Sequence, residues 1–209
     1  MKALVKEDVD WNKVEMFHLD EYIGMLKAHP ASFRRYLEER FASRINLRKA
    51  YYVSGEGDIK ENIRILTEEI RKAPVDLALI GIGENAHIAF NDPPADFETK
   101  EAYIVVNLDE KCRNQQLGEG WFSAIDEVPK QAVSMTVYQM LQSKAIVSCV
   151  PYKVKADAIK KTLENEPDNR IPATVLKTHP DWALFLDEDS ASLADKKYLA
   201  PSSANIWLE

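Results

Sequence analysis

Residues 75–94 read VDLALIGIGENAHIAFNDPP, an apolar run that breaks into glycines, a histidine and two prolines. The apolar part, residues 75–83, is almost continuously hydrophobic, as strands are when helices cover both faces of a parallel sheet. His87 follows in a predicted loop, with Asn85 before it and Asp92 after it. The stretch is therefore compatible with a dinucleotide site, a metal site or a site of acid–base chemistry.

The rest of the chain alternates strand-like and helix-like segments. Four more short apolar runs have the strand pattern, at residues 14–19, 103–108, 144–150 and 182–187. Apolar residues at helical spacing predict helices near residues 33–41, with Pro30 close to the start, at 59–70, with Asp58 as N-cap, and at 153–165. This alternation predicts an α/β fold of three layers, with a doubly wound, mostly parallel sheet, in a single domain over residues 1–209.

The composition limits the partners that the chain can bind. Its 209 residues carry a formal net charge of −7 without a cluster of Lys and Arg, so we expect no nucleic-acid-binding surface. No apolar run approaches the roughly 18 residues that a membrane-spanning helix needs, and the charged N-terminus does not resemble a signal peptide. Cys112 and Cys149 form no CxxC or metal-ligand pattern, so we expect reduced thiols in a cytoplasmic protein.

The three interpretations of the loop around His87 differ in what else they require. GIGENA fits the dinucleotide pattern GxGxxG/A, but that pattern needs a helix to begin there, and the prolines soon end any helix. His87 has no second His or Cys at ligand spacing, so no metal site is predicted. Acid–base chemistry remains, because Asn85 and Asp92 can orient His87 and hold its charge. The alternative is a core histidine that a backbone carbonyl satisfies.

Polar residues also follow other predicted strands. Ligands of open α/β sheets bind outside the carboxyl ends of the strands, which makes Asp20, Glu21 and Lys155 candidates for contact with a substrate. Lys155 lies near a predicted helix N-terminus, where it could join the helix dipole in holding a phosphate. As alternatives, Asp20 caps a turn or helix, and Lys155 is a solvated helix residue.

Several motifs together resemble the glucosamine-6-phosphate deaminase (isomerase) family. This family belongs to a wider group of phosphosugar isomerases, phosphogluconolactonases and coenzyme A transferase-like folds, and the resemblance runs from about residue 10 to 195. The HIAFN motif is typical of the deaminase branch rather than the lactonase branch. The motifs are FHLDEY (17–22), HPASFRRYL (29–37), GIGENAHIAFNDPP (81–94), VPKQAVSMTV (128–137) and KTHPDWALFLDEDSA (177–191).

The resemblance implies an activity and roles for individual residues. The family converts glucosamine 6-phosphate, a phosphorylated amino sugar, to fructose 6-phosphate and ammonia without an organic cofactor. By resemblance, Asp20 moves the proton between C2 and C1 of the open-chain sugar. His87 assists ring opening, and Lys155 helps to hold the phosphate.

The chain also departs from the best-known members of the family. Asn85 and Asp92 stand where those enzymes have Asp and Glu, and Gln116 stands where they carry a phosphate-binding arginine. Family members begin with a strand and a phosphate loop that we expect to be missing before Met1. We therefore expect an N-terminally truncated member of the family with impaired phosphate binding.

Two other functions are compatible with the residues. One is a different reaction on the same scaffold, such as hydrolysis of 6-phosphogluconolactone. The other is a non-catalytic protein that binds a sugar phosphate or has lost its function. An exposed strand edge would favour association, so a homo-oligomer is also compatible with the chain.

Overall fold

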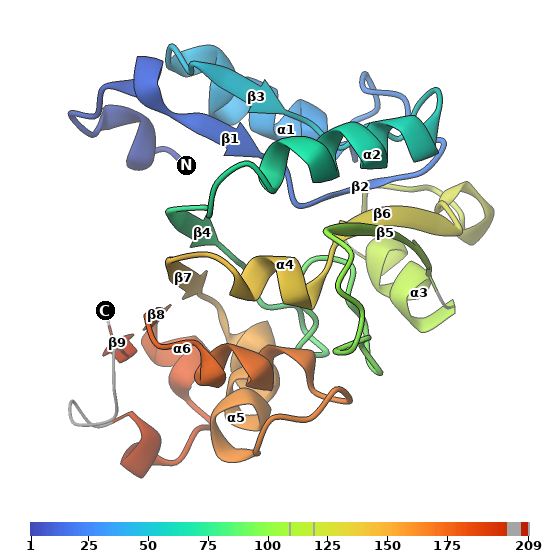
Figure 1. Ribbon diagram of the computed structural model, residues 1–209. Coiled ribbons are helices and arrows are strands. Elements are labelled where there is room, and N and C mark those ends of the chain that lie inside the picture. Colours follow the sequence, from blue (N-terminus) through green and yellow to red (C-terminus); the bar gives the residue numbers. More distant parts are fainter. Residues whose placement is uncertain (109, 119, 200–205, 209) are drawn as a thin grey trace. The chain divides into compact units, whose positions relative to one another are not determined.

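The structure, a computed structural model, describes residues 1–108, 110–118, 120–199 and 206–208 (Figure 1). The chain forms two compact units. The first contains Met1–Arg71 and Tyr103–Ser134, and the second contains Lys72–Ala102 and Met135–Glu209. The single domain over residues 1–209 stays a prediction.

The first unit contains two small sheets. β1 (Glu15–Phe17) pairs in parallel with β3 (Lys49–Tyr51). In the other sheet, β6 (Gln131–Met135) lies between β2 (Asp20–Tyr22) and β5 (Tyr103–Asn107), and β2 and β6 are antiparallel. The helices include α1 (Phe33–Arg40), α2 (Ile59–Ile70) and α3 (Glu110–Gly118), with 3-10 turns at Leu4–Lys6, Trp11–Lys13, Ala42–Arg44 and Ile125–Glu127.

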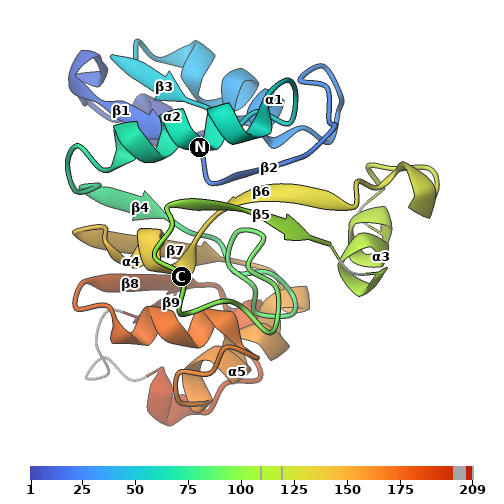
Figure 2. The ribbon, with the colours of Figure 1, turned by 45° about the vertical axis from the view of Figure 1, so that its right-hand side comes forward.

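The second unit is built on a parallel sheet. Its strands follow the order β4 (Leu77–Leu79), β7 (Ala145–Val150), β8 (Trp182–Leu186) and β9 (Ile206–Leu208). The helices α5 (Ala156–Glu164) and α6 (Glu188–Ala191) pack side by side (Figure 1, Figure 2). The unit also contains α4 (Val137–Leu141) and 3-10 turns at Lys153–Lys155, Pro172–Thr178 and Lys196–Tyr198.

Burial explains why these segments form strands and helices. Alternate residues of β7 and β8 share one face of the sheet, where Ile146, Leu184 and Leu186 are buried. In α5, the predicted apolar stripe of Ala156, Ile159 and Leu163 is buried as well. The predicted α/β fold with a mostly parallel sheet is therefore confirmed. No helix among the described residues has the length and apolar character that crossing a bilayer requires.

The helix starts follow from short polar side chains. Asp58 caps α2 by accepting a hydrogen bond from the Glu61 N–H at 3.0 Å, as predicted. The cap of α1 is Ser32, whose Oγ accepts from the Arg35 N–H at 3.1 Å, and Pro30 lies before it.

Glu21 connects β2 to the start of α1. Its side chain is 2% exposed, and its carboxylate accepts hydrogen bonds from the Ser32 hydroxyl at 2.7 Å and the Arg34 N–H at 2.9 Å. The Tyr22 N–H donates to its other oxygen at 2.9 Å. Both oxygens thus accept hydrogen bonds from residues of the first unit, which indicates a structural role. The contact of Glu21 with a substrate stays a prediction.

We expect Glu21→Ala to destabilise the protein, because three donors lose their buried acceptor. An unsatisfied buried donor costs about 1–3 kcal/mol, so the free energy of unfolding should fall by roughly 3 kcal/mol or more. Urea denaturation followed by circular dichroism measures the change. Glu39→Ala, at an exposed position of α1, is the control, and we expect it to cost less than about 0.5 kcal/mol. Similar losses in the two variants would contradict the role of Glu21.

Candidate active site

The loop that carries His87 is anchored from two sides within the second unit. The Ala86 carbonyl accepts a hydrogen bond from the Ala173 N–H at 2.8 Å. The buried Asn91 side chain donates to the Ile88 carbonyl at 2.9 Å and to the Met135 carbonyl at 2.8 Å. No pattern in the sequence indicates this bridging role of Asn91. These bonds hold the loop at the carboxyl end of β4.

Asn85, His87 and Asp92 form one hydrogen-bonded network in this loop. The His87 Nδ1 lies 2.6 Å from Asn85 Oδ1 and 3.2 Å from Asp92 Oδ1. The Asn85 amide group also donates to Asp92 Oδ1 at 2.9 Å. The His87 and Asp92 side chains are 18% and 19% exposed, so the network is shielded but reachable. The structure therefore brings together three of the predicted site residues.

The network determines which nitrogen of His87 carries the proton. Asn85 Oδ1 accepts from the His87 backbone N–H at 3.1 Å, while Asn85 Nδ2 faces the Asp92 carboxylate, and together these bonds fix the orientation of the amide. His87 Nδ1 consequently faces two acceptor oxygens and must donate to them. In the neutral imidazole, Nε2 then carries the lone pair and can accept a proton.

Lys155 lies at the same edge of the parallel sheet as this network. β4 and β7 are neighbours and run parallel, so the loops after both strands leave the same edge. Lys155 is half-buried and directly precedes α5, and no side chain of a described residue caps that helix. Tyr152, three residues before Lys155, has φ +82°, and its N–H donates to Asp187 Oδ2 at 2.9 Å.

Asp20 lies in the first unit, at the start of β2, and its side chain is half-buried. Burial raises the pKa of its carboxyl group from 3.8 to about 7, and the nearby charge of Glu21 adds to the rise. A carboxyl group with a pKa near 7 can both accept and donate a proton at neutral pH. That Asp20 lines one crevice with His87 stays a prediction.

Buried groups near Asp20 have shifted pKa values too. Burial, together with the Asp20 charge, raises the pKa of Tyr103 above its ordinary range, and the Tyr103 hydroxyl donates to the His18 carbonyl at 3.0 Å. Burial, with the charge of Arg34, lowers the pKa of His18 to about 3, so its imidazole is neutral at neutral pH. A neutral His18 brings no positive charge that would lower the pKa of Asp20.

Two side chains of α3 form hydrogen bonds inside the first unit. Gln116, which stands where related enzymes were expected to carry arginine, is buried and accepts the Tyr22 hydroxyl hydrogen bond at 2.6 Å. The Arg113 guanidinium donates to the carbonyls of Val128, at 3.1 Å, and Ile125. Both side chains thus have structural partners in the positions that they occupy here.

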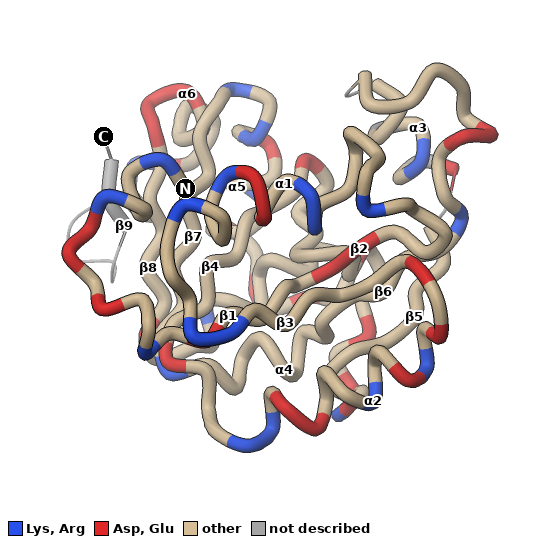
Figure 3. The backbone as a smooth tube through the Cα atoms, turned by 90° about the horizontal axis from the view of Figure 1, so that it is seen from above, with Lys and Arg blue, Asp and Glu red and all other residues tan. Residues whose placement is uncertain are grey.

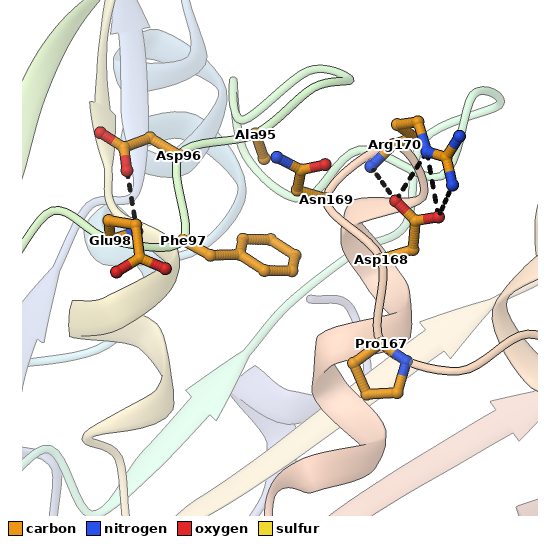
Figure 4. Close-up of a pocket in the computed structure, with 8 residues that line it drawn as sticks. All are labelled: Ala95, Asp96, Phe97, Glu98, Pro167, Asp168, Asn169 and Arg170. Atoms are coloured by element: carbon orange, nitrogen blue, oxygen red, sulfur yellow. Dashed lines mark hydrogen bonds and ion pairs between the residues drawn. The ribbon is translucent and has the colours of Figure 1, made fainter.

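An open hollow of about 530 Å³ in the second unit is lined by none of the candidate residues. Figure 4 shows Asp168 and Arg170 paired with one another on one side and Asp96 and Glu98 on the other. Three carboxylates line the hollow, and its one arginine is neutralised by Asp168, so it is unsuited to a phosphate. We therefore assign the candidate site to the His87 loop instead.

The distribution of charged residues and of possible metal ligands limits the kinds of site that the described residues can form. Figure 3 shows Lys and Arg interspersed with Asp and Glu along the chain, as in α2, rather than collected in one basic segment. Within the described ranges, no group of three or more His, Cys, Asp and Glu could hold a metal ion. The described residues thus offer acid–base groups and local cations.

Comparisons of the sequence with known proteins agree on one family. The family model described as glucosamine-6-phosphate isomerases/6-phosphogluconolactonase matches residues 1–184. The glucosamine-6-phosphate deaminase of Thermoanaerobacter pseudethanolicus is 38% identical over 190 residues, which cover 89% of this chain and 74% of that protein. The glucosamine-6-phosphate deaminase of Oenococcus oeni is 34% identical over 196 residues, covering 93% and 81%.

Solved structures give the same result. A monomeric glucosamine-6-phosphate deaminase matches with a TM-score of 0.77 and 33% identity, over 85% of this chain and 73% of that one. A 6-phosphogluconolactonase from Thermotoga maritima matches with a TM-score of 0.72 and 18% identity, over 88% and 78%, a likeness that shows the fold alone. The resemblance seen in the motifs is confirmed, and the chain belongs to the family of glucosamine-6-phosphate isomerases and 6-phosphogluconolactonases.

Proposed function

We propose that the chain is an enzyme that converts glucosamine 6-phosphate and water to fructose 6-phosphate and ammonia. The observation that carries the proposal is the Asn85–His87–Asp92 network, which presents a histidine with a basic Nε2. The identity of 38% and 34% to two glucosamine-6-phosphate deaminases supports the choice of substrate. This reaction needs proton transfers but no electron transfer.

His87 opens the sugar ring in this proposal. Its Nε2 takes the proton of the C1 hydroxyl, and a proton is returned to the ring oxygen as the bond between C1 and that oxygen breaks. Asp92 stabilises the transient imidazolium, because its carboxylate lies 3.2 Å from Nδ1. The product of this step is the open-chain aldehyde.

Asp20 then moves a proton between two carbon atoms. As a carboxylate it takes the proton from C2, beside the C1 carbonyl, and returns a proton to C1. The C=O double bond at C1 is thereby replaced by a C=N double bond at C2. Water adds at C2 and ammonia leaves, which gives the ketose. The pKa of about 7 suits both halves of this transfer, because Asp20 must hold and then release a proton.

Lys155 is our candidate for contact with the phosphate. It is a half-buried lysine at the start of α5, where backbone N–H groups and the helix dipole favour an anion. Glu21 contributes by holding α1 beside Asp20. We further propose a cytoplasmic enzyme, in keeping with a phosphorylated substrate and with two cysteines outside any CxxC pattern.

A coupled assay tests the proposed function. The purified chain, incubated with glucosamine 6-phosphate, should release ammonia and fructose 6-phosphate in equal amounts. A parallel assay with 6-phosphogluconolactone should give no hydrolysis above the buffer rate. Lactone hydrolysis without ammonia release would instead favour the lactonase, and binding without turnover would favour a sugar-phosphate-binding protein.

His87→Gln should slow the cyclic substrate by about 10²–10⁴-fold, because general acid–base help to ring opening is lost. An analogue without the C4 and C5 hydroxyls can close neither the five-membered nor the six-membered ring, so its isomerisation should change little. The ratio of the two rates is the measurement. Equal losses on both substrates would mean that His87 serves binding or structure.

Asp20 should make stability depend on pH in a defined direction. Its pKa is about 7 in the folded chain and near 3.8 when unfolded, so between these values only the folded chain keeps the proton. The contribution of Asp20 to the free energy of unfolding should therefore fall as the pH rises from about 4 to about 7, by up to roughly 1.4 kcal/mol per pH unit, while His18, with its pKa lowered to about 3, contributes an opposite rise below about pH 6.5. Asp20→Asn should remove this slope, and the exposed Asp8→Asn should keep it. An identical slope in all three proteins would rule out the raised pKa.

A further inference from the structure

Gly83 lies in close contact with the His87 imidazole. Its N–H donates to the His87 carbonyl at 2.9 Å, and its own carbonyl accepts from the Ala86 N–H at 3.0 Å. These bonds fold residues 83–87 into a tight loop, which brings the His87 ring over the Gly83 backbone. Gly83 itself is buried.

No side chain fits at position 83 while the ring stays in place. A Cβ atom built there would lie 2.2 Å from His87 Cε1, 2.3 Å from Nε2 and 2.4 Å from Nδ1, far inside ordinary van der Waals contact. The φ of Gly83 lies outside the left-handed region, so its backbone conformation would accept an alanine. The three atoms nearest to such a Cβ all belong to the imidazole, which is therefore the main steric reason for a glycine here.

The ring has little freedom to move away from such a Cβ. Its Nδ1 is held by Asn85 and Asp92, and the Asn85 amide is itself held by the His87 N–H. A shift of the ring by the ångström or so that an added methyl group demands would break the short bond to Asn85. A misplacement of that size can cost about 10²-fold in rate.

We propose that Gly83 is a positioning residue. Because it has no side chain, it leaves room for the His87 imidazole in the position that ring opening requires. The role deepens the proposed function and rests on it for its catalytic consequence. It also gives the second glycine of GIGENA a steric reason that involves no dinucleotide. Gly81, the other glycine of that pattern, is exposed and has nothing within 4 Å of a built Cβ.

The matched variants Gly83→Ala and Gly81→Ala test the proposal in the full chain. Gly83→Ala should slow the cyclic substrate by about 10²-fold and leave the open-chain analogue without the C4 and C5 hydroxyls nearly unchanged. Gly81→Ala should stay within about twofold of the parent on both substrates. In a His87→Ala background, Gly83→Ala should have no further effect on the cyclic substrate, because the ring that it displaces is absent.

The melting temperature gives a readout that does not depend on activity. Gly83→Ala should lower Tm by about 4 °C or more in the parent and by much less in the His87→Ala background. If the chain proves not to be a deaminase, this cycle still tests the contact between Gly83 and His87. Unchanged ring opening in Gly83→Ala, or equal Tm losses in both backgrounds, would overturn the proposal.

Discussion

The hydrogen bond between Asn85 Oδ1 and His87 Nδ1, 2.6 Å long, is the constraint on which the site depends. Because the amide oxygen also accepts from the His87 backbone N–H, it cannot turn away without leaving that donor unpaired. Asp92 is bound to the other end of the same amide, so the carboxylate is held next to the imidazole. An asparagine at position 85 thus orients the histidine and leaves one carboxylate, rather than two, to stabilise its charge.

The two ionisable groups to which the proposed function assigns proton transfers obtain their properties by different means. His87 obtains its orientation and tautomer from hydrogen bonds, in a loop that Asn91 and Ala86 anchor. Asp20 obtains a pKa of about 7 from burial and from the charge of Glu21. Glu21, in turn, is kept in place by the start of α1. Residues with distinct environments are expected where one reaction needs both ring opening and isomerisation.

Much of the fold could be predicted from hydrophobic patterns. The apolar runs correspond to β1, β4, β5, β7 and β8, and the apolar stripes correspond to α1, α2 and α5. β2, β3, β6 and β9 were not predicted. β2 and β3 have three residues each and include charged side chains, too little for a periodic signal, and β6 buries Ser134 among its apolar residues. These segments are extended because they pair with neighbouring strands, and such pairing leaves no local pattern in the sequence.

The candidate site was predictable only where its residues are close in sequence. Asn85, His87 and Asp92 lie within one short loop, so their mutual contact follows from spacing, and the structure confirms it. The pKa of Asp20 depends on how much protein surrounds its carboxyl group, which no local pattern encodes. The need for glycine at position 83 likewise depends on where the His87 ring lies in space.

The protonation of His87 at its two ring nitrogens tests the account most directly. Long-range ¹H–¹⁵N correlation spectra of the chain with ¹⁵N-labelled histidine, assigned through His87→Gln, distinguish a protonated from an unprotonated ring nitrogen. For the neutral ring, the hydrogen-bond network predicts a proton on Nδ1 and a free lone pair on Nε2. A neutral His87 with its proton on Nε2 would contradict the hydrogen-bond network and the ring-opening role that rests on it.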